Sequence, residues 1–185
     1  MRKLIATINM SLDGFCDHTA MDADDEIHQH YTDLLKSGDI IIYGRITYQL
    51  MESYWPLVLK NPTGNKSDDD FAVAIDNIQK IVYSRTLKNV DWKNTTLKNE
   101  MNKEEITAVK QQPGKPIFVG SPGLIIALMN LDLVDECQIM VHPTILGSGL
   151  ALFKNINERK NLTLLKTKTF GCGAVAHYYA NAGNK

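Results

Sequence analysis

The sequence predicts an α/β fold whose central sheet mixes parallel and antiparallel strands. Three apolar runs end in a small-residue turn, at Gly44, Ser84 and Gly120. Such runs, alternating with helical patterns, are typical of parallel strands. Near the C-terminus, two further apolar runs flank Gly171-Cys-Gly173, which is the spacing of an antiparallel hairpin. Parallel strands together with a closing hairpin give a mixed sheet.

The first elements in the chain are expected to be a strand, a helix and a second strand. Residues 4–8 form a β-branched apolar run. A helix is expected to begin near the acidic cluster Asp22 to Asp25, because acidic side chains favour a helix N-terminus. Ser37-Gly38 ends this helix, and residues 40–43 follow as a short apolar run that predicts a buried strand.

The middle of the chain continues the alternation. Helical character returns from Tyr48, and Tyr54-Trp-Pro56 predicts the end of this short helix, because proline interrupts helical hydrogen bonding. A brief helix is expected after Asp68. The later elements are predicted as a strand at 80–84, a strand at 96–97, a helix at 99–112, a strand at 116–119, a helix at 124–130, a strand at 136–142 and hairpin strands at 162–170 and 174–179.

The length of the chain allows one soluble globular domain with a substantial core, or at most two small ones, and a single domain over residues 1–185 is expected. The chain is 44% hydrophobic and 22% charged, as is ordinary for such proteins. Its formal net charge is -1, so it lacks the broad positive field that attracts nucleic acids and anionic membranes. Three widely spaced cysteines without a CxxC motif indicate neither a disulfide framework nor a metal site. A cytoplasmic protein without a membrane span is therefore expected.

The turn after residues 40–43 is the first candidate for chemistry. A strand that stops at Gly44 and leads into a helix leaves backbone N–H groups at the helix start, where an anion such as phosphate binds well. Arg45 adds a planar set of donors, and Thr47 adds a hydroxyl. The alternative is an ordinary corner in which Thr47 caps the helix and Arg45 lies in solvent.

The repetition of this pattern favours a binding site. Ligands of parallel α/β sheets bind at the carboxyl ends of the strands. The ends at Gly44, Ser84 and Gly120 can converge on one extended ligand that bears phosphates.

An ordered set of motifs resembles the dihydrofolate reductase-like superfamily. The set comprises Met10-Ser-Leu-Asp-Gly14, Gly44-Arg-Ile-Thr-Tyr48, Ser84-Arg-Thr-Leu87, Gly120-Ser-Pro-Gly-Leu124 and His142-Pro-Thr-Ile-Leu-Gly-Ser-Gly149. Within the superfamily, it resembles the branch of the C-terminal reductase domain of the bifunctional riboflavin-biosynthesis deaminase/reductase. The resemblance covers residues 4–179.

This resemblance implies a three-layer αβα fold, bound NADPH and a homodimer. The residues that it implies for the cofactor are Ala6, near the nicotinamide, Gly44, Arg45 and Thr47, at the phosphates, Ser84, Arg85 and Thr86, beside the adenosine 2′-phosphate, and Gly120, Ser121, Pro122, Gly123 and Leu124, at the pyrophosphate. Two arginines can bind a dianionic 2′-phosphate in bidentate fashion, so NADPH is preferred over NADH.

Two residues are candidates for the substrate side. Asp13 follows the first strand, where its carboxylate can orient a substrate or relay a proton; the alternative is a turn aspartate before Gly14. Trp55 is either a wall of the substrate pocket or a core aromatic before Pro56.

Two functions are open at this stage. One is an NADPH-dependent oxidoreductase that transfers hydride to a small heterocyclic or carbonyl substrate, pterin-like or pyrimidine-like, as in 5-amino-6-(5-phosphoribosylamino)uracil reductase. The other is a non-catalytic nucleotide-binding module that keeps the fold. Dihydrofolate reductases resemble one another in an acidic pterin-binding residue that follows a loop with Trp or Leu-Pro. The loop from Cys16 to Asp24 contains neither Trp nor Pro, so the sequence names no substrate.

Overall fold

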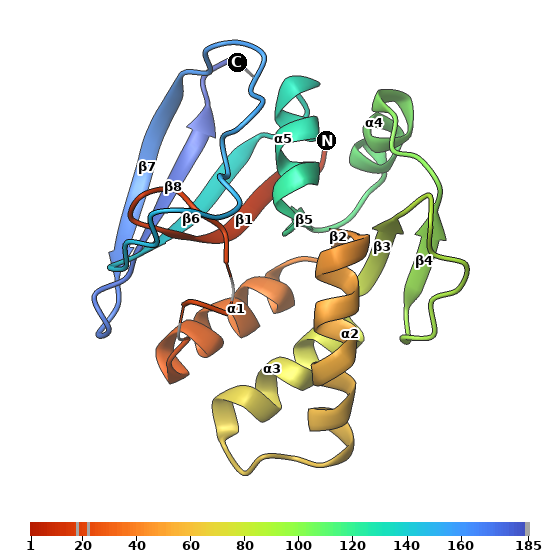
Figure 1. Cartoon of the computed structure of the whole chain (residues 1–185). Helices are drawn as coiled ribbons and strands as arrows, with labels where there is room; N and C mark the ends of the chain where they lie inside the picture. The colour runs from red at the N-terminus through yellow and green to blue at the C-terminus, as the bar shows by residue number, and fades with distance from the viewer. Residues whose placement is uncertain (18, 22, 184–185) are drawn as a thin grey trace. The chain divides into compact units, whose positions relative to one another are not determined.

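The computed structural model describes residues 1–17, 19–21 and 23–183, and this part of the chain contains eight strands and five helices (Figure 1). Two compact units divide the chain, and each is built from discontinuous segments. The first comprises Met1–Arg2 and Ala23–Phe118, and the second comprises Lys3–Asp22 and Val119–Lys185. That residues 1–185 act as a single domain remains a prediction.

Three parallel strands form the sheet of the first unit. They are β2 (Ile40–Gly44), β3 (Gln79–Tyr83) and β4 (Thr95–Lys98), in the order β4-β3-β2. Gly44 pairs with Tyr83, and Tyr83 pairs with Lys98. The three strands therefore end together, and whatever follows each of them leaves the same end of the sheet.

Three of the four helices in the first unit begin with a capping side chain. These are α1 (Asp25–Ser37), α3 (Lys66–Asn77) and α4 (Lys103–Gln111), and each also has acidic residues in its first turn. Asp24 caps α1 through the Ile27 amide, so the acidic start expected for this helix is confirmed as far as the described residues show; Asp22 lies outside them. Such caps satisfy the backbone N–H groups that a helix start leaves open.

The fourth helix, α2 (Arg45–Lys60), is longer than predicted. Pro56 lies inside it, so the expected end at residues 54–56 is wrong. Proline removes one backbone hydrogen bond from a helix and costs about 3 kcal/mol. The turn beyond it buries Val58, which is 4% exposed, and the Asn61 amide still bonds the Leu57 carbonyl at 2.9 Å. Packing after Pro56 therefore offsets the lost bond.

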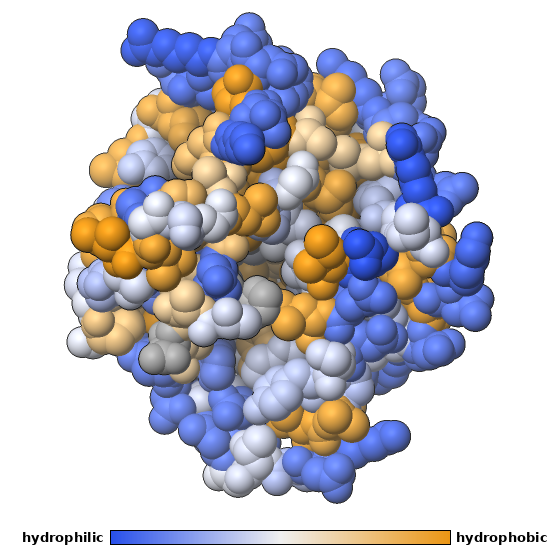
Figure 2. Space-filling model, viewed as in Figure 1, coloured by the Kyte–Doolittle hydropathy of each residue, from blue (hydrophilic) through white to orange (hydrophobic). Residues whose placement is uncertain are grey.

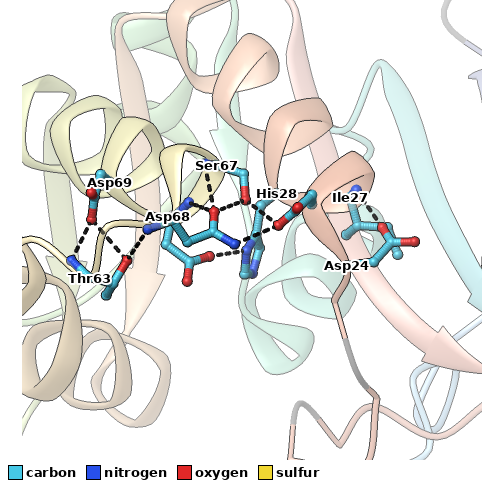
Figure 3. Close-up of polar contacts among 9 residues, drawn as sticks. Asp24, Ile27, His28, Thr63, Ser67, Asp68 and Asp69 are labelled. Atoms are coloured by element: carbon cyan, nitrogen blue, oxygen red, sulfur yellow. Dashed lines mark hydrogen bonds and ion pairs between the residues drawn. The ribbon is translucent and has the colours of Figure 1, made fainter.

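A polar cluster joins α1 to the start of α3 (Figure 3). Asp25 Oδ1 accepts hydrogen bonds from Asn65 Nδ2 and from Ser67 Oγ, both at 2.8 Å. His28 Nδ1 lies 2.5 Å from Asp68 Oδ1. The bonds from Asn65 and Ser67 hold the pKa of the Asp25 carboxyl below its ordinary value. The acidic residues at these two helix starts are thus structural partners of neighbouring side chains.

A buried lysine fastens the end of α3 to the segment before β4. Lys80, at the start of β3, is 0% exposed. Its Nζ donates to the carbonyls of Asp76 at 3.1 Å, Ile78 at 3.0 Å and Lys93 at 3.1 Å. It also lies 4.4 Å from the centre of the Trp92 ring, within the range of a cation–π interaction. Burial lowers the pKa of Lys80 to about 8.

The second unit contains a mixed sheet, as predicted. Its strands are β1 (Leu4–Ser11), β6 (Glu136–His142), β8 (Val175–Asn181) and β7 (Leu162–Thr169), in that order. β1 pairs with β6 in parallel, whereas β6–β8 and β8–β7 are antiparallel. The C-terminal hairpin is therefore confirmed (Figure 1). β5 (Ile117–Val119) spans the boundary between the units, and α5 (Pro122–Asn130) follows it. Among the described residues, no helix is both long and apolar enough to cross a membrane.

Candidate functional site

The start of α2 differs from the starts of α1, α3 and α4. Gly44 is its N-cap residue, no side chain caps it, and its first turn contains no acidic residue. The side chains of Arg45 and Ile46 are exposed there, and Thr47 is half-buried. The partial positive charge of the helix dipole is therefore not offset by a carboxylate at this end. Thr47 does not cap this start, whereas Arg45 is exposed, as the ordinary-corner alternative expects, and bonds Gln49 Oε1 at 3.0 Å. An anion would be well accommodated at such a start.

In the second unit, the start of α5 has the same character. Ser121 is its N-cap residue, without a capping hydrogen bond from its side chain, and Pro122 opens the helix. Its first turn contains no acidic residue either. A Cβ added at Gly123 would meet nothing within 4 Å. The backbone at Gly123 is thus open to a ligand, as close approach to a phosphate requires.

The turn after β3 carries the second predicted group of site residues. Ser84 Oγ accepts hydrogen bonds from the amides of Thr86 at 3.2 Å and Leu87 at 3.0 Å, so this serine shapes its own turn. Arg85 Nη2 lies 2.5 Å from Glu100 Oε1, and these side chains are 77% and 64% exposed. Exposed ion pairs contribute about 0–1 kcal/mol, so Arg85 can exchange this partner for a phosphate.

The strand register brings three cations of the first unit to one end of its sheet. Arg45 follows the paired residue Gly44 and Arg85 follows β3, on neighbouring strands that lie about 4.8 Å apart. Lys98, at the end of β4, is a third cation at this end and is ion-paired with Glu105. The sequence did not indicate Lys98. Its place beside β3 depends on the order of the strands in the sheet, and the short apolar run at residues 96–97 does not predict that order.

Asp13 is held between two loops of the second unit. Its carboxylate accepts hydrogen bonds from Ser11 Oγ at 2.6 Å and from the amides of Gly147 at 2.7 Å and Leu146 at 3.2 Å. The bond from Ser11, with those from the two amides, keeps the pKa of Asp13 below its ordinary value. A carboxylate held ionised in this way accepts hydrogen bonds and is a poor proton donor near neutral pH. Ala6 lies on β1 and is fully buried.

Trp55 belongs to the helices of the first unit. Its ring centre lies 4.4 Å from that of Phe71 and 5.9 Å from that of His28, which it meets edge-on. Trp55 is half-buried, so it packs α2 against α1 and α3. These contacts correspond to the core-aromatic alternative; a role at a substrate pocket remains a prediction.

The predicted site residues therefore fall into two sets. Gly44, Arg45 and Thr47 lie beside the turn at residues 84–86, at the common end of the parallel strands of the first unit. Ala6, Asp13 and residues 120–124 belong to the second unit. α2 in the first unit and α5 in the second each follow a strand end directly, and each begins without a capping side chain or an acidic residue in its first turn.

The family model of the RibD C-terminal domain matches residues 2–176. The chain belongs to the RibD C-terminal domain family. This match spans segments of both units, and it confirms the resemblance drawn from the ordered motifs. The family and the fold are those of reductases.

Known proteins resemble this RibD C-terminal domain along nearly its whole length. YyaP of Bacillus subtilis (strain 168), an uncharacterized protein, is 33% identical over 186 residues, covering 96% of this chain and 94% of YyaP. A crystal structure from Shewanella sp. PV-4, named for riboflavin biosynthesis, has a TM-score of 0.74 at 18% identity, covering 97% and 98% of the two chains. Dihydrofolate reductase from Enterococcus faecalis, complexed with NADP(H), has a TM-score of 0.62 at 13% identity, covering 97% and 96%. The fold is thus dihydrofolate reductase-like.

Proposed function

We propose that this protein is an NADPH-dependent reductase that transfers hydride to a small heterocyclic or carbonyl substrate. One observation carries the proposal: α2 and α5, which follow strand ends, are the helices that begin without a capping side chain or an acidic first turn. The family is one of reductases, and these two helix starts suit the phosphates of a dinucleotide. The donors present therefore fit NADPH.

Each set of residues would have a separate task in holding the cofactor. Backbone N–H groups at Arg45 to Thr47 would bind a phosphate, with the Arg45 guanidinium as counter-charge. The α5 start, from Gly120 to Leu124, would bind the pyrophosphate, and the buried backbone at Ala6 would lie near the nicotinamide. Bound NADPH would supply the hydride, and the protein would supply orientation and electrostatics.

The preference for NADPH over NADH is assigned to Arg85, with Ser84 and Thr86 beside it. An adenosine 2′-phosphate is a dianion, which an arginine binds through two parallel hydrogen bonds. The competing pair with Glu100 is exposed and weak. The exchange of that carboxylate for a phosphate is therefore favourable.

On the substrate side, Asp13 would keep the loop after β1 in place, while water provides the proton. The lowered pKa of Asp13 favours an accepting, orienting role over proton donation. A pterin-like or pyrimidine-like substrate and a place in riboflavin biosynthesis are parts of this proposal. Trp55 would support the helices that frame the first unit.

A second candidate is a non-catalytic nucleotide-binding module that keeps the fold. Asp13, the residue predicted for catalysis, accepts three hydrogen bonds from its own loops, and this structural use of its carboxylate favours the alternative. NADPH binding without NADPH oxidation by any acceptor would distinguish the module from the reductase.

We also propose a homodimer in the cytoplasm. β7 is the last strand of its sheet, and nearly all of it is exposed, including Leu164 and Leu165 at 55% and 52%. Exposed edge strands can pair with another chain. The small-molecule ligands are the other partners, and neither nucleic acid nor membrane is proposed.

Replacement of Arg85 by alanine is expected to weaken NADPH binding about tenfold, because one charged bidentate contact is lost. NADH, which has no 2′-phosphate, should bind the variant and the parent chain equally. Both dissociation constants can be measured by titration of nicotinamide fluorescence.

The matched control for this prediction is Lys60→Ala, which removes one exposed positive charge from the opposite end of α2. It should change neither constant. An equal loss of affinity for NADPH and NADH in Arg85→Ala would contradict the assignment of Arg85 to the 2′-phosphate.

A further inference from the structure

Two loops of the second unit leave the same end of its sheet and are fastened together. Residues 11–17 begin at the last residue of β1, and residues 143–153 follow β6, its parallel neighbour. The Leu12 amide donates to the Thr144 carbonyl at 2.8 Å, and two further backbone bonds join the segments. We refer to these residues as the loop pair. Since ligands bind at the carboxyl ends of parallel strands, the loop pair is placed to meet a substrate.

The loop pair exposes large apolar side chains. Ile145 is 72% exposed, Leu12 63%, Leu150 57% and Phe153 47%. Figure 2 shows hydrophobic surface gathered over the loops that follow β1 and β6. Exposed apolar side chains gathered on one face of a protein are typical of a site that binds a ligand or partner.

Within its own residues the loop pair contains no positive charge, although the exposed Lys154 directly follows its second segment. The sequence holds no Lys, Arg or His within residues 11–17 or 143–153. It holds two carboxylates: Asp13 is bonded to Ser11, Leu146 and Gly147, and Asp17 is bonded to Thr19. A phosphate placed against these apolar side chains would gain no counter-charge from the loop pair, and any hydration that it lost there would not be compensated.

We infer that the loop pair binds an uncharged, flat, apolar hydride acceptor, such as a quinone or a neutral heterocycle, and discriminates against acceptors that carry a phosphate. The inference rests on the proposed function, because the acceptor would be reduced by NADPH. Leu12 and Ile145 would cover the flat face of the acceptor, and Asp13 would fix the spacing of the two loops.

Riboflavin and its 5′-phosphate, FMN, are a matched pair of probes, because they share one flat ring system and differ by a phosphate. Fluorescence anisotropy of the flavin measures binding with and without saturating NADP⁺. Riboflavin is expected to bind at least tenfold more tightly than FMN. Menadione is a second uncharged probe; it should displace bound riboflavin and so lower the flavin anisotropy.

Variants of the loop pair test the location of the site. Leu12→Ser combined with Ile145→Ser should weaken riboflavin binding about tenfold, as expected for the loss of apolar contact area. Ile145→Arg should instead strengthen FMN binding about tenfold by supplying the missing counter-charge. Val73→Ser, which removes an exposed apolar side chain from α3, is the matched control and should change neither affinity.

Several outcomes would overturn the inference. They are FMN binding as tight as riboflavin binding, no binding of either uncharged probe, an unchanged riboflavin affinity in the double serine variant, and conversion of a dimer to a monomer by that variant in light scattering. Failure of the proposed function is recognised separately, because NADP⁺ would then fail to bind while the anisotropy without NADP⁺ still reports on the loop pair.

Discussion

Replacement of Gly123 by aspartate is expected to weaken NADPH binding about 100-fold without loss of stability. A carboxylate in the first turn of α5 would lie near the pyrophosphate, and two like charges a few ångströms apart repel by about 3 kcal/mol at the surface of a protein. The same carboxylate interacts favourably with the helix dipole, by about 0.3–1 kcal/mol. The space around Gly123 accepts a Cβ without contact. Binding and stability should therefore change in opposite directions.

Gly123→Asn is the matched control, because asparagine has the shape of aspartate without its charge. It should retain most of the affinity for NADPH. Dissociation constants by titration and unfolding free energies by urea denaturation, on the same samples, check both parts. Equal affinities for Gly123→Asp and Gly123→Asn would show that no phosphate lies at the α5 start.

Replacement of Lys80 by alanine is expected to lower the free energy of unfolding by about 4 kcal/mol. The truncation leaves a cavity where a fully buried side chain lay. It also removes the amine that donates hydrogen bonds to the backbone carbonyls of Asp76, Ile78 and Lys93. In the variant these three carbonyls lose that partner. Lys80→Met keeps the cavity filled but cannot donate hydrogen bonds, so a decrease of about 2 kcal/mol in the free energy of unfolding is expected. Exposed Lys88→Met is the control, with a change within about 0.5 kcal/mol.

The pH dependence of these variants has a definite sign. In the folded chain Lys80 has a pKa of about 8, below its ordinary value of 10.5, because it is desolvated. Between these two values the unfolded chain holds the proton and the folded chain does not, so stability from this group rises with pH. The parent chain should therefore gain stability relative to Lys80→Met from pH 8 to 10. A constant difference between the two would contradict the burial of a titrating amine.

The sequence predicted the strand ends well because those signals are local. The buried run at residues 40–43 and the glycine after it lie next to each other in the chain, and so does the step from β5 into α5. The C-terminal hairpin was predictable for the same reason, since its turn lies between the strands that it joins.

Other features depended on contacts between distant residues. The end of α2 was misplaced because proline at position 56 is a strong local signal, whereas the packing of Val58 that overrides it is tertiary. The three bonds to Asp13 include two from amides more than 130 residues away. Lys98 joins the cation group only through the pairing of β4 with β3. None of these has a pattern in neighbouring residues.

The most direct test of the central claim is the mapping of NADPH onto backbone amides by NMR. Chemical shifts should change at Ile46 and Thr47 at the start of α2, and at Gly123 and Leu124 at the start of α5. Residues at the opposite ends of the strands, such as Asn94, should be unaffected. Shifts confined to those opposite ends, or no shifts at saturating NADPH, would contradict the assignment of a dinucleotide to these helix starts.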